Sequence, residues 1–456
     1  MKNTSTKIHG FRFPERIREM KTLNELKTLA CQEIDRRRQE LIAFGTDIWK
    51  HPEPGYREFR TAQAAAAKLE ELGLTVTGGL ACTGFRADLD TGRPGPVVAL
   101  LGEMDSLILP THPEADPSTG AVHACGHNTH ITALTGAAAG LSAAGVPDSC
   151  SGKIALIGVP AEESLNPVYA EELRSSGKIR FTSGKAELIR CGVFDDVDIA
   201  MMNHSGCSFH VSDFNGHLLK DVIFHGKSAH AASPDGGINA MSAANLALHA
   251  LALAKDNWTS EPYVRVHGLI THAGDAVNIV PDRVAMTYML RADSFDALTR
   301  LSTVFDRAVN GAAYALGAVC EIRTRHGSSP LKNSDSLCDI YRRCVEELVP
   351  DAHIRVKEFF IPGCTDMGDL SEIIPSVHGY FPCCAGTCHG TDFRIADQEQ
   401  AYILSSKLLA CMALELIAGD AAAGKKIAEE KKSKLPIPEY LKRISGFESH
   451  TRFPSD

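Results

Sequence analysis

Two short motifs carry the residue types that a hydrolytic metal site needs. Cys125 and His127 lie two residues apart in His-Ala-Cys-Gly-His, and Glu162 and Glu163 are adjacent in Pro-Ala-Glu-Glu. Thiolate and imidazole bind zinc and similar divalent ions well, and a neighbouring carboxylate can move the protons of a water that such an ion activates. Together the two motifs indicate a metallohydrolase.

Each motif alone also has an ordinary structural explanation. A free cysteine is commonly buried, and adjacent glutamates usually form a solvated pair at the start of a helix. On an extended segment, however, Cys125 and His127 would point the same way and could reach one ion. Glu103 and Asp105 add two more carboxylates in Gly-Glu-Met-Asp. If the four carboxylates converge, a cation has to hold them together.

Two later histidines are further candidates. His204 follows the apolar run Ile199–Met202, and His389 lies in Cys-Cys-Ala-Gly-Thr-Cys-His-Gly-Thr-Asp-Phe. A satisfied structural histidine is an equally good interpretation of either one. The latter segment also holds three cysteines (Cys383, Cys384 and Cys388). No Cys-x-x-Cys or spaced histidine pair completes a zinc knuckle there, so we interpret these three as packing thiols.

The middle of the chain offers three residues that suit substrate rather than metal. His230 lies in the loop Gly226–Pro234, Asn278 lies in Val-Asn-Ile-Val-Pro, and Arg291 closes an expected strand. A histidine, an amide and an arginine can bind a developing oxyanion and a substrate carboxylate. Ordinary polar loop residues are the alternative for each.

The elements expected around the first motifs form an α/β pattern. Val97–Leu101 and Ile154–Val159 are short apolar runs that predict buried strands, and Thr129–Ala144 predicts a helix between them. Polar residues follow both strands, where α/β proteins place their sites. Helices are also predicted over four other segments: Leu23–Trp49, Thr61–Leu72, Ser336–Val349 and Ala401–Ala418.

The middle predicts a different, α+β unit in β-α-β-β-α-β order. Its expected elements are strands Leu218–Phe224, Arg265–Ile270 and Arg283–Leu290, and helices Ile238–Ala254 and Phe295–Ala315. We therefore predict an inserted domain over residues 213–325 and a discontinuous catalytic domain over 1–212 and 326–456. Residues 420–456 are charged and predict a helix followed by a loosely held tail.

Composition excludes several classes of partner. The chain has 456 residues, a formal net charge of −9 and no basic cluster, which argues against nucleic acid and anionic membranes. No apolar run predicts a membrane span, and the N-terminal 20 residues lack the apolar core of a signal peptide. The 14 cysteines, without a secretory signal, are expected to be reduced in the cytoplasm.

The motifs, in their order, resemble the family of metal-dependent aminoacylases, dipeptidases and auxin-conjugate hydrolases. Within it the chain is most similar to the p-aminobenzoyl-glutamate hydrolase-like branch. The pieces that carry the resemblance begin at His51-Pro-Glu-Pro-Gly-Tyr-Arg-Glu, continue through Gly102-Glu-Met-Asp, His123-Ala-Cys-Gly-His-Asn, Gly158-Val-Pro-Ala-Glu-Glu and Thr365-Asp-Met-Gly-Asp-Leu-Ser, and end at His389-Gly-Thr-Asp-Phe.

The resemblance implies an α/β fold of the zinc-peptidase type, with a central mixed sheet flanked by helices. It also implies an inserted α+β, ferredoxin-like lid domain through which two copies form a homodimer. By position, the implied ligands of one or two divalent ions, zinc or manganese, are Cys125, His127, Glu163, His204 and His389. Glu162 is the implied general base. His230 is implied to support the tetrahedral intermediate, often from the partner subunit, and Asn278 and Arg291 to contact substrate.

Three features depart from the family pattern. His130 lies about one turn after His127, where it could contact metal, although helix packing is the simpler expectation. The segment Ser164–Cys191 is long and basic, and the loop Thr111–Thr119 is also enlarged. The segment Ser164–Cys191 borders the expected site, so we do not carry over the substrate of the nearest branch.

The function that we expect is hydrolysis of the amide bond of an N-acyl or N-aroyl amino acid, or of a small dipeptide, by water activated at the metal. Hydrolytic deamination of an aromatic or heterocyclic amine is the alternative on the same scaffold. A non-catalytic binding protein is a third interpretation. It is disfavoured because a binding protein has no need of a base such as Glu162 beside its metal.

Overall fold

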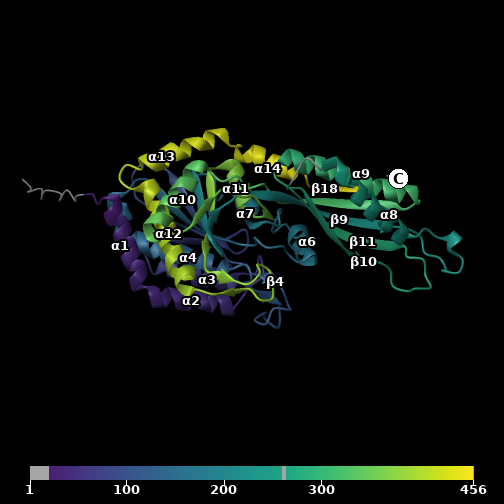
Figure 1. Cartoon of the computed structure of the whole chain (residues 1–456), viewed down its shortest axis with the longest axis horizontal. Helices are drawn as coiled ribbons and strands as arrows, with labels where there is room; N and C mark the ends of the chain where they lie inside the picture. The colour runs from purple at the N-terminus through teal and green to yellow at the C-terminus, as the bar shows by residue number, and fades with distance from the viewer. Residues whose placement is uncertain (1–19, 259–262, 455–456) are drawn as a thin grey trace, which may run out of the picture.

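The computed structural model describes residues 20–258 and 263–454, and this part of the chain builds two large sheets that lie side by side along the long axis (Figure 1), together with two short two-stranded ones. The larger sheet is mixed and has eight strands in the order β1-β2-β6-β3-β7-β15-β8-β13. Their bounds are β1 Val76–Leu80, β2 Gly84–Asp90, β3 Val97–Glu103, β6 Lys153–Val159, β7 Ile199–Gly206, β8 Phe209–Val211, β13 Ile354–Val356 and β15 Ser376–Pro382.

Helices cover both faces of this sheet, because its central strands are apolar on both sides. In β3, Val98 and Leu100 belong to one core cluster, whereas Ala99 and Leu101 belong to another. The first face packs against helices α1 (Leu23–Arg36), α2 (Arg38–Lys50), α3 (Phe59–Glu70), α4 (His127–Ala144), α10 (Asp335–Leu348), α12 (Ser405–Ile417) and α13 (Ala422–Ala428). The second packs against α6 (Pro167–Ser175), α7 (Gly184–Arg190), α11 (Met367–Ile373) and α14 (Ile437–Ser445).

The smaller sheet has six strands, and the sequence predicted its β-α-β-β-α-β order. Strands β9, β10, β11 and β12 and helices α8 and α9 follow one another as expected, and β14 joins β9 in parallel. The bounds are β9 Phe214–His225, α8 Ala240–Leu253, β10 Arg265–His272, β11 Arg283–Ala292, α9 Phe295–Ala315, β12 Val319–Ser328 and β14 Ile361–Cys364. The α/β fold with a second, ferredoxin-like sheet is confirmed. The boundaries of 213 and 325 stay a prediction. We call this sheet with α8 and α9 the lid.

The C-terminal segment differs from its prediction as a loosely held tail. After α14 the chain forms β18 (Ser449–Phe453), which pairs antiparallel with β12 and extends the lid sheet (Figure 1). Glu448 reinforces the join, because its carboxylate accepts the His326 backbone N–H at 3.0 Å and Arg174 of α6 at 2.5 Å. Composition alone missed this strand because its stabilising partners lie more than a hundred residues away.

Of the residues that the structure describes, one helix meets the length and composition of a membrane span, and it coincides with the helix predicted over Ala401–Ala418. It runs over Glu399–Ile417, through a π-helical turn (Glu399–Leu404) into α12. Of its most apolar window, 78% is buried inside the protein, where α12 packs against α1, α4 and α10. It is therefore placed as a core helix. The N-terminal segment used to argue against a signal peptide lies, except for Met20, outside the described residues.

Candidate metal centre

The candidate site lies where four neighbouring strands end. Strands β6, β3, β7 and β15 run parallel, so their carboxyl ends meet at one edge of the large sheet. Glu103 is the last residue of β3, Glu162 and Glu163 follow β6 within four residues, and His204 lies near the end of β7. The strand-end placement predicted from sequence therefore brings these side chains together.

Cys125 and His127 meet by a different geometry from the extended segment that we expected. Gly126 between them is left-handed, with φ 83°, and His127 is already the first residue of α4. A Cβ atom at Gly126 would lie 2.1 Å from the Ser205 Oγ, so a side chain does not fit here. The turn, rather than strand alternation, directs both side chains to the same place.

The resulting group has the donors of a divalent metal. Ligand atoms of Cys125, His127 and Glu163 all lie within 4.8 Å of one another. His127 Nδ1 is 3.0 Å from Asp105 Oδ1, while its buried Nε2 lies 3.3 Å from Glu103 Oε2 without a hydrogen bond. Asp105 Oδ2 also accepts the Glu163 backbone N–H at 2.9 Å. A carboxylate behind one imidazole nitrogen, with the other nitrogen turned toward the donor group, is how metal-binding histidines are usually oriented.

His204 and His389 lie beside the group formed by Cys125, His127 and Glu163. His204 binds the Ser205 carbonyl oxygen through Nδ1 at 2.7 Å, which leaves its Nε2 3.7 Å from Cys125 Sγ. His389 Nε2 lies 3.2 Å from Glu163 Oε1. His389 is largely exposed, whereas His204 is buried, so the centre opens to solvent on the His389 side.

Cys388 also belongs to the site, although we had interpreted it as a packing thiol. Its sulfur, Cys125 Sγ and a His389 nitrogen all lie within 4.8 Å of one another. A hydrogen bond with Cys125 lowers the pKa of Cys388 to about 5, and the same bond raises the pKa of Cys125. Cys383 and Cys384 contact each other instead, at 3.5 Å. The short spacing to His389 was the sequence signal that could have distinguished Cys388.

Glu162 is placed as a base would be. Its Oε2 lies 3.9 Å from His127 Nε2, which is 3.3 Å from Glu103 Oε2. Burial raises its pKa well above the ordinary carboxyl value, and the neighbouring Glu103 and Glu163 carboxylates add to the effect. The preceding Ala161 has a left-handed backbone, φ 46°, and its N–H donates to Glu58 Oε1 at 2.8 Å. This strained turn aims the two glutamates, and strain of this kind is concentrated at functional sites.

A buried lysine holds the converging carboxylates, and we had not singled it out. Lys185 of α7 is fully buried, binds Glu103 Oε1 at 2.5 Å and also binds Asp366. Burial alone would lower the pKa of Lys185, but Asp366 and Glu103 raise it above the usual value. Lys185 comes from the long segment Ser164–Cys191. The basic composition of that segment indicated that a cation could lie near the site, but the sequence does not tell which of its lysines and arginines is buried.

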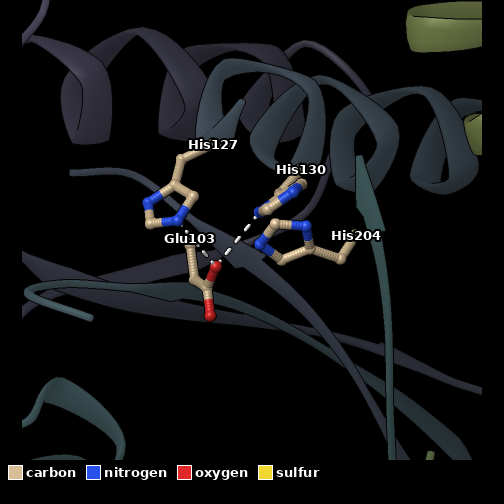
Figure 2. A group of neighbouring side chains, drawn as sticks. All are labelled: Glu103, His127, His130 and His204. Atoms are coloured by element: carbon tan, nitrogen blue, oxygen red, sulfur yellow. Dashed lines mark hydrogen bonds and ion pairs between the residues drawn. The ribbon is translucent and has the colours of Figure 1, made fainter. Parts of the chain in front are cut away.

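His130 is a positioning residue rather than a further ligand. Figure 2 shows it beside Glu103, His127 and His204, four residues whose ligand atoms also lie within 4.8 Å of one another. Both His130 nitrogens are already used, because Nδ1 donates to Glu103 Oε2 at 3.1 Å and Nε2 accepts the Ser205 N–H at 3.2 Å. His130 therefore links Glu103 to the β7 backbone beside His204.

The three lid residues lie away from this group. His230 and Asn278 are exposed and neighbour each other, since the Ala231 N–H donates to the Asn278 carbonyl at 3.0 Å. Arg291 is closer: it is half-buried at the end of β11, near the Cys364 thiol, whose pKa burial raises and to which both Arg291 and Glu162 also contribute. In the described part of this single chain, His230 and Asn278 contact lid loops rather than the metal donors.

Comparison with known families decides how the site is classified. The model of peptidase family M20/M25/M40 matches residues 84–415, which span the donors from Glu103 to His389. The chain belongs to this family. It is therefore a hydrolase of carbon–nitrogen bonds, and the donor set above fits the divalent metal of such enzymes.

Several M20 family members are similar over most of the chain. The Xaa-Arg dipeptidase of Mus musculus is 29% identical over 435 residues, covering 87% of this chain and 90% of its own. One of the subunits of the p-aminobenzoyl-glutamate hydrolase of Escherichia coli is 31% identical over 321 residues, covering 66% of this chain and 61% of its own. A dinuclear metal-binding M20 peptidase from Bacillus subtilis shares the fold, with a TM-score of 0.63 at 21% identity over 83% of this chain and 98% of its own.

Removing single donors tests the metal group directly. We expect Cys125→Ala and His389→Ala to weaken metal binding at least about tenfold, because each removes a side chain that could contact the ion. Metal content after dialysis, measured by mass spectrometry of the elements, reports the effect. Cys191→Ala and His353→Ala, which change exposed residues outside the group, serve as controls. Wild-type metal content in both donor variants would contradict the assignment.

Proposed function

We propose that this M20 family protein hydrolyses the amide bond of an N-acyl or N-aroyl amino acid or of a small dipeptide. The observation that carries the proposal is the position of Glu162: a largely buried carboxylate, 3.9 Å from the Nε2 of the metal-donor candidate His127 and next in sequence to the donor Glu163. A non-catalytic binding protein would not need this carboxylate.

The mechanism assigns separate roles to neighbouring residues. Cys125, His127, Glu163, His204 and His389 would hold one or two divalent ions, which when bound polarise the amide carbonyl and acidify water. Glu162 takes a proton from the attacking water and returns it to the leaving amine. Burial raises the pKa of Glu162 above that of an ordinary carboxyl, which makes it a stronger base for the first of these steps. Asp105 keeps the His127 ring in one tautomer throughout.

A cavity of about 390 Å³ lies beside the glutamates and suits the substrate. Ser106 and Ser164, which directly follow Asp105 and Glu163, line it. Much of the rest of its wall comes from the two segments that depart from the family pattern, including Thr119 of the enlarged loop and Tyr169 and Glu172 of α6. The wall also includes Arg57, whose guanidinium stacks over the Tyr169 ring at 3.9 Å. These segments therefore set the specificity in our proposal.

Product analysis of the metal-loaded protein tests the reaction. The panel includes N-acyl and N-aroyl amino acids, p-aminobenzoyl-glutamate and dipeptides ending in arginine, since two relatives carry the last two substrates in their names. Release of a carboxylic acid with an amine supports the proposal. Release of ammonia with a hydroxylated product would instead indicate deamination. If no compound of the panel is turned over, the proposal of amide hydrolysis is overturned. A homodimer formed through the lid and a cytoplasmic location belong to the same proposal.

A further inference from the structure

The mechanism above makes no use of the Cys388 thiol. Cys388 precedes His389 directly and is exposed at the open side of the centre. Its sulfur, Cys125 Sγ and a His389 nitrogen lie mutually within 4.8 Å, the spacing of donors that surround one ion. A tetrahedral zinc ion with Zn–S bonds of about 2.3 Å holds two sulfurs about 3.8 Å apart, which this spacing accommodates.

The backbone explains how two consecutive residues can face one ion. On an extended chain the side chains of Cys388 and His389 would point to opposite sides. Here His389 is left-handed, with φ 61°, a conformation that costs energy outside glycine and that bends the chain between the two side chains. The His389 N–H also donates to the Ala124 carbonyl at 3.0 Å, which fixes this loop against the residue before Cys125. The left-handed turn at His389 and its hydrogen bond to Ala124 together hold the two thiols and the imidazole close to one another.

We propose that Cys388 is a metal ligand, sharing with Cys125 and His389 one ion of the centre. This adds a second thiolate to the five ligands inferred above. It rests on the metal centre of the proposed hydrolase but not on the bond that the enzyme cleaves.

A second thiolate has a consequence for the choice of metal. Thiolates are soft ligands that favour zinc, whereas manganese favours carboxylate and water oxygen. This ion site should therefore retain zinc in preference to manganese, even though carboxylates surround it. Replacing the sulfur of Cys388 by oxygen should reduce that preference.

Cobalt substitution tests the ligand without any substrate. Metal-free full-length protein is loaded with Co²⁺ under a reducing agent, and the sulfur-to-cobalt charge-transfer absorbance is recorded in the near ultraviolet. For two thiolates on one ion, Cys388→Ser and Cys125→Ser should each lose about half of this absorbance, and the double variant nearly all of it. Competition with a chelator should show zinc binding at least about tenfold weaker in Cys388→Ser.

Cys207→Ser is the matched control, because Cys207 is an exposed thiol at the end of β7 that contacts the Cys384 carbonyl rather than the donors. It should keep the full absorbance. Circular dichroism shows whether each variant is folded. An unchanged spectrum and zinc affinity in folded Cys388→Ser would overturn the proposal, as would a wild-type spectrum without charge-transfer absorbance. The cobalt spectrum tests the ligand and not amide cleavage. It therefore remains a valid test of Cys388 even if no substrate is found in the panel.

Discussion

Replacing Glu162 by glutamine should slow turnover by about 10²–10⁴-fold, the usual contribution of a general base. The amide is nearly the same size as the carboxylate but cannot accept a proton from water. Because Glu162 is not among the residues that we expect to bind the ion, metal content should stay at the wild-type level. Steady-state kinetics on a substrate found in the panel, together with metal analysis of the same sample, measures both quantities.

Glu70→Gln is the control for this substitution, since Glu70 is an exposed carboxylate at the end of α3. It should leave turnover unchanged. Full activity in Glu162→Gln would refute the assignment of the base. Loss of metal together with activity would instead make Glu162 a ligand, and the neighbouring glutamate would then be the candidate base.

Replacing Lys185 by methionine should lower the free energy of unfolding by about 3–5 kcal/mol, because it leaves buried carboxylates without their cation. Lys185 is fully buried between Glu103 and Asp366, and methionine keeps most of its length without its charge. Denaturant unfolding of the metal-free protein measures the loss. Lys178→Met, on the same segment but exposed, should change stability by no more than about 0.5 kcal/mol.

The stability deficit of Lys185→Met should depend on pH. In the wild type, burial would raise the pKa of Glu103, but Lys185 and His127 hold it well below 4.5, so the pair stabilises the fold above that pH. Without the lysine, burial raises the pKa of Glu103, and stability is lost as the pH rises through the new value. The deficit should therefore be larger at pH 8 than at pH 5. Adding Glu103→Gln to Lys185→Met should recover part of the lost stability. If Lys185→Met alone is as stable as the wild type, Lys185 does not stabilise the buried carboxylates.

Local patterns predicted the fold well because its elements carry their own signals. The apolar run at Val97–Leu101 and the helical period of Phe295–Ala315 both correspond to elements of the structure, the second of them residue for residue. β18 escaped prediction because all five of its residues are exposed, which leaves no apolar alternation to recognise. An edge strand of that kind is defined by the partner that it pairs with, here β12.

Site residues could be predicted from the sequence where the residue type alone indicates the chemistry. They could not be predicted where their role depends on burial of the side chain or on the backbone conformation. Cys125, Glu162 and Glu163 stood out by chemistry and by their place after strands. Lys185 did not, because a lysine in a basic segment is ordinarily solvated, and only tertiary packing places this one between two carboxylates. Cys388 was overlooked because the left-handed turn at His389, which brings the two side chains together, is not encoded in any motif.

The pairing of β18 with β12 attaches the lid to the end of the chain. The chain passes into the lid before β9, leaves it after β12, contributes β14 to the same sheet, and returns to it after α14 through residues 446–448 alone. Three residues can span only about 10–11 Å when fully extended. A large rotation of the lid therefore has to separate β18 from β12 or move α14 out of the core. The end of the chain acts as a tether that limits how far the site can open.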